Sequence, residues 1–502
     1  MNECRAKSKR FLWPIAVVAA CLAAAAGIRH FLSPRGGRSD GALTDREISR
    51  VDGWRLLDRV PTDGATMTSA RFEAVVDKPA PVLKSFRIEN TSNKPIGGFW
   101  IYREGAPNFR NALTIVESVT AGRETDGEKA AALFALFPKF YENFYPASDG
   151  GLLYEPSVLL AVFGWGQCNI ASHNLETLCQ LAGFETRGVG LETPGTNFAH
   201  KTMEVFYEGA WHYFDPDGRV FFTRDDGRIA SVADLQAAPD LIRRGPEPVG
   251  YDRETYAAAF ERGKVEVFEY PEKFRMAQRH RDPAHYPHYR HVMRYDLLPR
   301  TTFRLERGNR GLFYSERKDM GPPPSYANGV IRTTVRGAEA AVWGEFIVDG
   351  ALILPVVSPY ILVGGRIEGT TEKSLRVAWL PFNKDPMYRA VWTDLGTVRG
   401  RFSLDFSPCF HEYPIFGYAL KLTPAPSEIG ASVIEVVTDF QHNPKAFPQL
   451  KQGPNAFYLY TSDARQFTPL PGGGGLEVET PDGLRVVFEV EPGEKRELKS
   501  EN

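Results

Sequence analysis

Three residues of this chain are of the types that cysteine-based catalysis uses. Cys168 follows a Gly-Trp-Gly-Gln turn and opens an amphipathic run, residues 168–181, in which apolar residues recur at helical spacing and which Gly183 can terminate. His200 and Asp215 lie in two later runs of strand character. A thiol in the first turn of a helix is either a small core residue or a nucleophile, because a helix N-terminus favours the thiolate.

The spacing of the two later residues predicts that they meet. If Glu208 and Gly209 form a two-residue hairpin turn, Asp215 pairs opposite Thr202, and His200 lies two residues along on the same face. Diagonal neighbours of this kind are about 7–8 Å apart at the backbone, a distance that an imidazole and a carboxylate can bridge. A carboxylate-held imidazole beside a helix-terminal thiol forms an activated nucleophile.

Each of these residues also has a simpler interpretation. Cys168 can be a buried thiol, His200 an ordinary strand histidine, and Asp215 a turn residue of Asp-Pro-Asp-Gly. Their occurrence in one order favours the joint interpretation. Glu204 and Trp211 are predicted to support the strands and the core rather than to catalyse.

Three blocks of sequence carry a family resemblance: GWGQC, NIASHNLETLCQLAGFETRGVG and HKTMEVFYEGAWHYFDPD. Together they resemble the transglutaminase-like superfamily, whose pattern is a Gly-x-Cys helix, a Gly with an Arg-x-Val strand, a His-x-x-x-Glu-Val strand, and a Trp followed by Asp-Pro. The match lies within residues 128–222. It implies a papain-related α+β core that attacks an amide or related acyl carbon through a thioester and releases the acyl group to water or an amine.

The resemblance also implies roles for single residues. Cys168 would be the nucleophile, His200 the general base and acid, and Asp215 the residue that orients His200. Asn169 and His173, next to the nucleophile, depart from the family pattern. Gln167 could shape the site or serve the turn, and no upstream oxyanion donor is assigned.

The remaining sequence predicts β structure on both sides of this core. Residues 70–102 alternate apolar and polar positions between Pro, Asn and Gly, and beyond residue 301 short strands such as ALILPVV and SLRVAWL recur between turn signals. Thr125 or Asp126 can cap a helix that Pro138 interrupts. We therefore expect an α+β protein with a transglutaminase-like core flanked by β-sandwich-like domains. The expected boundaries are 1–28 signal peptide or anchor, 29–50 linker, 51–110 small β domain, 111–235 core, 236–300 mixed connection and 301–495 β-sandwich-like domain.

The N-terminus predicts export. A basic flank precedes an uncharged apolar run over residues 11–28, the pattern of a signal peptide or of a retained anchor with its positive end inside. The sequence VAAC ending at Cys21 also resembles a lipoprotein box. We expect a cell-envelope protein, membrane-anchored or secreted, with its core domains outside the cytoplasm. Cys168, Cys179 and Cys409 give no disulfide framework, since their number is odd.

Charge and ligand patterns limit the function classes. The net charge of −2 provides no field that would attract nucleic acid. We assign no cofactor and no metal ligand to the core. The cluster His280, His285, His288 and His291 could bind a metal but has no i, i+4 pair, and Asp215, Asp217 and Gly218 resemble only a fragment of a calcium loop.

Two functions of different class remain open. The first is a cysteine enzyme acting on amide bonds of a protein, peptide or other envelope substrate, as a peptidase, an amidase or an acyl transferase. The alternative is a non-catalytic envelope scaffold that uses the same fold for binding.

Overall fold

The computed structural model describes residues 68–76, 83–144, 150–268, 293–315, 321–382, 391–410, 414–428, 432–451, 453–461, 470–471, 476–479, 483–490 and 496–499. The described residues all fall within one compact unit. The predicted signal segment, the linker and the cluster His280–His291 lie outside the described residues. Among the helices described, none combines the length and the apolar character that a membrane span requires.

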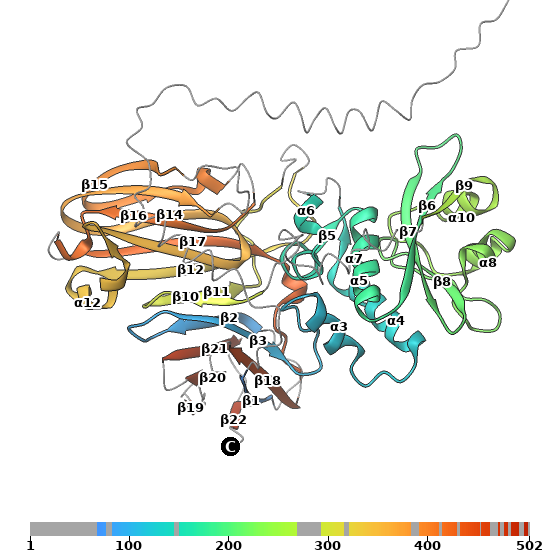
Figure 1. Ribbon diagram of the computed structural model, residues 1–502, viewed down its shortest axis with the longest axis horizontal. Helices are drawn as coiled ribbons and strands as arrows, with labels where there is room; N and C mark the ends of the chain where they lie inside the picture. The colour runs from blue at the N-terminus through green and yellow to red at the C-terminus, as the bar shows by residue number, and fades with distance from the viewer. Residues whose placement is uncertain are drawn as a thin grey trace, which may run out of the picture. The chain divides into compact units, whose positions relative to one another are not determined.

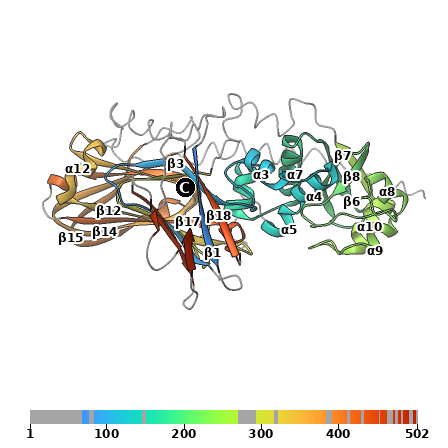
Figure 2. The same cartoon turned by 90° about the horizontal axis from the view of Figure 1, so that it is seen from below.

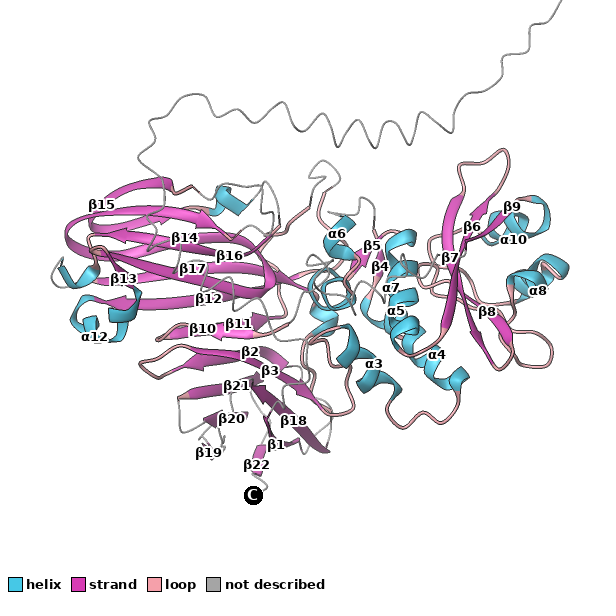
Figure 3. Ribbon diagram, viewed as in Figure 1, coloured by secondary structure: helices cyan, strands magenta, loops and turns pink. Residues whose placement is uncertain are grey.

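Helices dominate residues 112–181 (Figure 3). The last of these helices begins at Cys168. They are α3 (Ala112–Thr120), α4 (Asp126–Phe134), α5 (Leu136–Phe140), α6 (Gly150–Leu153), a π-helical turn (Val158–Phe163) and α7 (Cys168–Leu181). Thr125 caps α4 in a reciprocal capping box with Glu128, so the predicted cap is confirmed. Two short strands, β4 (Glu142–Asn143) and β5 (Trp165–Gly166), pair in parallel just before α7.

A four-stranded antiparallel sheet follows α7, with strand order β8-β7-β6-β9. Its strands are β6 (Glu185–Glu192), β7 (Ala199–Tyr207), β8 (Ala210–Phe214) and β9 (Lys264–Phe268). Three helices from the later part of this region are α8 (Val232–Ala237), α9 (Asp240–Arg244) and α10 (Arg253–Arg262). The described part of the predicted connecting region, 236–300, therefore supplies the edge strand β9 of this sheet and also contains the helices α9 and α10.

The two faces of the four-stranded sheet pack against different helices, as Figures 1 and 2 show. Met203 and Val205 of β7 share one core cluster with Leu175 and Leu178 of α7. Val189 of β6 joins a second cluster with residues of α8 and α10. Because side chains alternate along a strand, β7 presents His200 on the face opposite to Met203 and Val205.

Strands make up most of the described chain from residue 295 onward and form two large sheets with the strands that precede α3. The five-stranded sheet has the order β10-β3-β18-β1-β22. The eleven-stranded sheet runs β13-β14-β17-β12-β11-β2-β21-β20-β19, and β15 and β16 also pair with β14. The bounds are β1 (Thr68–Val76), β2 (Leu83–Asn90), β3 (Ile96–Arg103), β10 (Tyr295–Leu297), β11 (Thr301–Glu306), β12 (Ala327–Arg336), β13 (Ile347–Val348), β14 (Ala351–Pro381), β15 (Thr393–Asp405), β16 (Ile415–Thr423), β17 (Val433–His442), β18 (Gly453–Thr461), β19 (Leu470–Pro471), β20 (Leu476–Glu479), β21 (Leu484–Val490) and β22 (Arg496–Lys499).

Aromatic side chains join the two large sheets. Phe457 of β18 contacts Phe488 of β21 at a ring distance of 4.7 Å, and Tyr295 of β10 contacts Phe303 of β11 at 5.0 Å. The molecule is thus a mixed α/β protein with large antiparallel sheets. The strands of the predicted small β domain do not stand apart, since Thr68 of β1 pairs with Thr461 of β18 and β2 pairs with β11 and β21.

Strand β14 differs from the sequence prediction. The runs ALILPVV and SLRVAWL, predicted as separate strands, are the two ends of this one 31-residue strand. Its register shifts near Val357 and Leu362, and both Ile353 and Ala378 pair with Lys421, so β16 lies between the two ends of β14. Irregular pairing of this kind bends a strand, so the two ends of β14 can pair with β16 from opposite sides.

Candidate functional site

Helix α7 begins at Cys168 and presents its side chain at the first helical turn. The preceding residue, Gln167, has extended backbone angles and makes no side-chain capping bond. The parallel pair of β4 with β5 fixes the chain just before the helix, with Asn143 beside Gly166. Cys168 is partly exposed and free, while Cys179 of the same helix is buried. Of the two cysteines of α7, Cys168 is therefore the one that retains contact with solvent.

The β7–β8 hairpin has the register that the sequence predicts. Glu208 and Gly209 form the turn with φ angles of 52° and 75°, and Tyr207 pairs with Ala210. Two consecutive positive φ angles give the turn type that matches strand twist. Met203 pairs with Phe214, so Thr202 and Asp215 are the next positions along the two strands.

His200 and Asp215 are joined by a buried hydrogen bond. The distance from His200 Nε2 to Asp215 Oδ2 is 2.8 Å, and both side chains are fully buried. Asp215 Oδ1 accepts the backbone N–H groups of Asp217 and Gly218 at 3.0 and 2.9 Å, and Tyr256 donates its hydroxyl to Oδ2 at 2.7 Å. The carboxylate is therefore held by several donors at once and can fix the plane of the imidazole.

The electrostatics of His200 favour its protonated form. Burial by itself disfavours the imidazolium, but the charge and hydrogen bond of Asp215, followed by Cys168, raise the pKa of His200 to about 10. The other ring nitrogen, Nδ1, is buried and has no hydrogen-bond partner among the described residues. Since Nε2 is directed to Asp215, Nδ1 is the nitrogen that remains for a proton exchange with Cys168.

A second carboxylate, Asp217, completes the cluster. One ligand atom from each of Cys168, His200 and Asp217 lies within 4.8 Å of the others. Tyr141 donates its hydroxyl to Asp217 Oδ1 at 2.7 Å, and Asn143 donates its amide to Oδ2 at 2.6 Å. Burial, followed by the charge of Asp215, raises the pKa of Asp217.

Tyr251 covers the same cluster. Its ring centroid is 4.3 Å from that of His200, and its hydroxyl donates to Asp217 Oδ2. In the sequence, Asp217 belongs only to a turn or to a fragment of a calcium loop, and no pattern marks Tyr251. The i, i+2 spacing of two aspartates after a strand was the only available signal, because the partners of Asp217 come from distant parts of the chain.

His173, one of the two departures from the family pattern, belongs to a polar chain that links α7 to β7. Lys201 donates from Nζ to His173 Nε2 at 2.7 Å, and His173 Nδ1 lies 3.2 Å from Oε2 of the buried Glu176. Asn169, the other departure, donates to the Tyr154 hydroxyl at 3.1 Å. Lys201 follows His200 in β7, and His173 lies on α7 with Cys168. These polar contacts therefore connect the strand that bears His200 with the helix that bears Cys168.

Glu204 and Trp211 support the sheet, as predicted. Glu204 is buried and accepts the Arg187 side chain and the backbone N–H of Val232, each at 2.7 Å. The Arg187 guanidinium also lies 4.0 Å from the ring centre of Trp211. Both residues act through packing and hydrogen bonds within the sheet.

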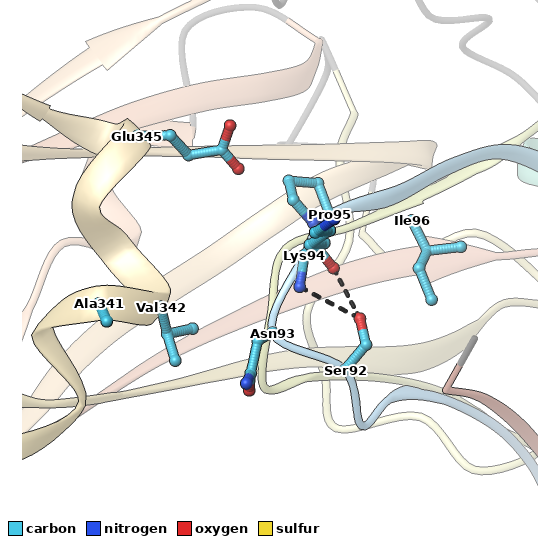
Figure 4. A pocket seen from close by; sticks show the side chains of 8 residues that line it. All are labelled: Ser92, Asn93, Lys94, Pro95, Ile96, Ala341, Val342 and Glu345. Atoms are coloured by element: carbon cyan, nitrogen blue, oxygen red, sulfur yellow. Dashed lines mark hydrogen bonds between the residues drawn. The ribbon is translucent and has the colours of Figure 1, made fainter. Parts of the chain in front are cut away.

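A cavity of about 820 Å³ lies apart from this cluster, between the β2–β3 connection and the segment around α12 (Ala340–Trp343), as Figure 4 shows. Its walls are Ser92, Asn93, Lys94, Pro95, Ile96, Ala341, Val342 and Glu345. None of these residues belongs to the Cys168 cluster.

Comparisons with known proteins name no family for this chain. No family model matches it, and no curated protein matches it. Among solved structures, a chain from a study entitled "The Substrate Binding Mode and Chemical Basis of a Reaction Specificity Switch in Oxalate Decarboxylase" is 9% identical, covers 87% of this chain and 88% of its own length, and has a TM-score of 0.08. A TM-score this low carries no argument about fold or function.

Proposed function

We propose that this chain is a transglutaminase-like cysteine enzyme that acts on amide bonds through a Cys168 thioester. The observation that carries the proposal is that the Cys168 sulfur, at the start of α7, lies within 4.8 Å of a ring nitrogen of His200, which Asp215 holds by a hydrogen bond. Asp215 holds His200 by Nε2, Cys168 is among the groups that raise the pKa of His200, and Cys168 is the partly exposed member of the set. This is the nucleophile, base and orienting residue of thiol catalysis.

The proposed reaction has two steps. Cys168 attacks the acyl carbon as a thiolate, a C–S bond forms, and the C–N bond breaks as His200 gives a proton to the departing amine. Water or a second amine then attacks the thioester, His200 takes a proton from it, and the C–S bond breaks. The backbone N–H at the start of α7 can stabilise the oxyanion, since the first helical N–H groups have no intrahelical acceptor.

The nucleophile is tested by labelling with an α-chloroacetamide that mimics an amide substrate. We expect the adduct at Cys168 of the folded full chain, and mass spectrometry locates it. Cys179 and Cys409 are the internal controls, and His200→Ala should slow the labelling of Cys168. Labelling of all three cysteines only after denaturation would instead support the non-catalytic scaffold.

Transfer is distinguished from hydrolysis by the acceptor. An amide substrate incubated with hydroxylamine gives a hydroxamate if an amine can attack the thioester, and only the acid if water alone can. Cys168→Ala should abolish both products. The hydroxamate yield therefore assigns the second step independently of the labelling result.

We further propose that the enzyme is exported, either anchored in the membrane by its N-terminal segment or secreted, and acts on a protein, peptide or other amide-containing envelope substrate. The basic flank and the apolar run over residues 11–28 support this proposal. A reporter enzyme that is active only outside the cytoplasm, fused after residue 50, should be active. An inactive reporter, with an active fusion to a known signal peptide as control, would contradict export.

A further inference from the structure

The cluster of Cys168, His200 and Asp217 presents the three ligand types of a transition-metal site. Their ligand atoms lie within 4.8 Å of one another. A zinc ion with bonds of about 2.0–2.3 Å places its ligand atoms roughly 3.3–3.8 Å apart, so the three groups need to approach one another by at most about 1–1.5 Å.

The groups around these ligands are those that zinc sites use. A zinc-bound histidine gives its other ring N–H to a carboxylate, and His200 Nε2 is held by Asp215 at 2.8 Å. This bond leaves Nδ1 as the ring nitrogen available to a metal ion, and Nδ1 is buried without a hydrogen-bond partner among the described residues. A buried ring nitrogen of this kind gains a partner when a metal ion binds it.

The carboxylate of Asp217 is oriented in the same way. Tyr141 and Asn143 hold its two oxygens, and each oxygen of a carboxylate offers two lone pairs. Oδ1 accepts one described hydrogen bond, from Tyr141, so it retains a lone pair for a metal ion. Thiolate, imidazole and carboxylate together favour Zn²⁺, whereas Mg²⁺ and Ca²⁺ prefer oxygen ligands.

We propose that Cys168, His200 Nδ1 and Asp217 bind one zinc ion, which reversibly blocks the nucleophile. The sulfur binds as thiolate and its proton passes to solvent. Three protein ligands leave a fourth position for water. The regulatory meaning rests on the proposed cysteine chemistry, because a sulfur that is bound to zinc cannot attack an acyl carbon.

Metal binding is measured on the metal-stripped full chain with ZnCl₂ in competition with a chromophoric chelator. We expect one zinc ion per chain, and a loss of affinity of roughly tenfold or more in Asp217→Asn. Asp226→Asn is the matched control, because Asp226 is a partly exposed carboxylate paired with Arg228. Equal affinity in the wild type and Asp217→Asn, or the absence of stoichiometric uptake, would overturn the site.

Cobalt identifies the sulfur ligand without relying on the Asp217 variant. CoCl₂ should give a thiolate-to-metal charge-transfer band in the wild type and in Cys409→Ser, and no band in Cys168→Ala. A band that persists in Cys168→Ala would overturn the proposal, even if Asp217→Asn fails to fold.

The two proposals fail separately. If both hold, the metal-free protein reacts with chloroacetamide at Cys168, stoichiometric zinc suppresses the reaction, and a chelator restores it. Reaction at Cys168 that zinc does not slow would overturn the metal site and leave the proposed enzyme intact. Zinc binding to a metal-free protein that chloroacetamide does not label would overturn the proposed enzyme and leave the metal site intact.

Discussion

At the scale of single residues, Asp215 has the most constrained environment of the cluster. In the wild type, His200 and Tyr256 donate hydrogen bonds to Asp215 Oδ2. An Asn at this position keeps one oxygen for the backbone N–H groups but turns an amide N–H₂ toward these two donors. Asp215→Asn should therefore remain folded and lose about 10²–10⁴-fold in turnover, because His200 loses its orientation. Amide turnover and melting temperature test this. An active variant of wild-type stability would remove Asp215 from the site.

The raised pKa of His200 predicts how stability depends on pH. The pKa is about 10 in the folded protein, against 6.5 for an unperturbed histidine, so the folded chain binds more protons between these values. The stabilisation is fully present below pH 6.5 and is lost as pH rises through about 10, because the free energy of unfolding falls by about 1.4 kcal/mol per pH unit in this window. Urea unfolding should show this decline in the wild type and not in His200→Gln. Equal declines would show that another group titrates.

Sequence spacing could predict the contact between His200 and Asp215 because a two-residue turn fixes the register of both strands. Asp217 lies just beyond the hairpin, where no strand periodicity applies. Its partners Tyr141 and Asn143 come from β4 and the residue before it, more than seventy positions earlier. Tertiary packing alone brings these groups together, so the third member of the cluster could not be read from the sequence.

At the scale of elements, the side-chain contacts of Lys201 with His173, and of His173 with Glu176, connect β7 with α7. Glu176 is 1% exposed, and Lys201→Met removes the positive charge from this set of contacts, which should destabilise the fold by about 2–4 kcal/mol. Adding Glu176→Gln removes the uncompensated charge, so the double variant should be more stable than Lys201→Met alone. Urea unfolding of the two single variants and the double variant measures the coupling. Strictly additive effects would show that the two charges do not interact.

Elements with local signals were predicted well, and elements that depend on distant pairing were not. The cap at Thr125, the start of α7 at Cys168 and the turn at Glu208 each follow from a few neighbouring residues. Strand β14 contains runs that resemble separate strands, because its bends arise from pairing with β15, β16 and β17. Short apolar runs cannot reveal that pairing.

At the scale of the whole molecule, the order of the chain conceals the arrangement of the sheets. Strands β1 to β3 precede the helices, yet they complete sheets whose other strands lie from residue 295 onward. Composition changes along the chain mark the helical region but cannot show that its flanks belong together. The predicted boundaries at residues 110 and 301 therefore separate strands that share sheets.

The side chain of Asn443 joins the large sheets to the segment before Cys168. Asn443 follows β17, is 1% exposed, and donates its amide to the carbonyl groups of Phe140 and Leu160, both at 2.7 Å. Its backbone N–H also donates to the Ala161 carbonyl at 3.0 Å. The π-helical turn that contains Leu160 and Ala161 leads directly into β5 and Cys168, so this residue supports the approach to the candidate site.

Asn443→Ala tests whether that support affects Cys168. The change removes the only described side-chain donor to these two buried carbonyl groups and should destabilise the fold by about 2–4 kcal/mol. The matched control is Asn90→Ala, since Asn90 is equally buried and donates to the carbonyl groups of Leu297 and Leu298 within the β region. Both variants should lose comparable stability in urea, but only Asn443→Ala should slow the chloroacetamide reaction of Cys168 under conditions where both remain folded. Equal reaction rates in the two variants would show that the sheets stabilise the molecule without positioning its thiol.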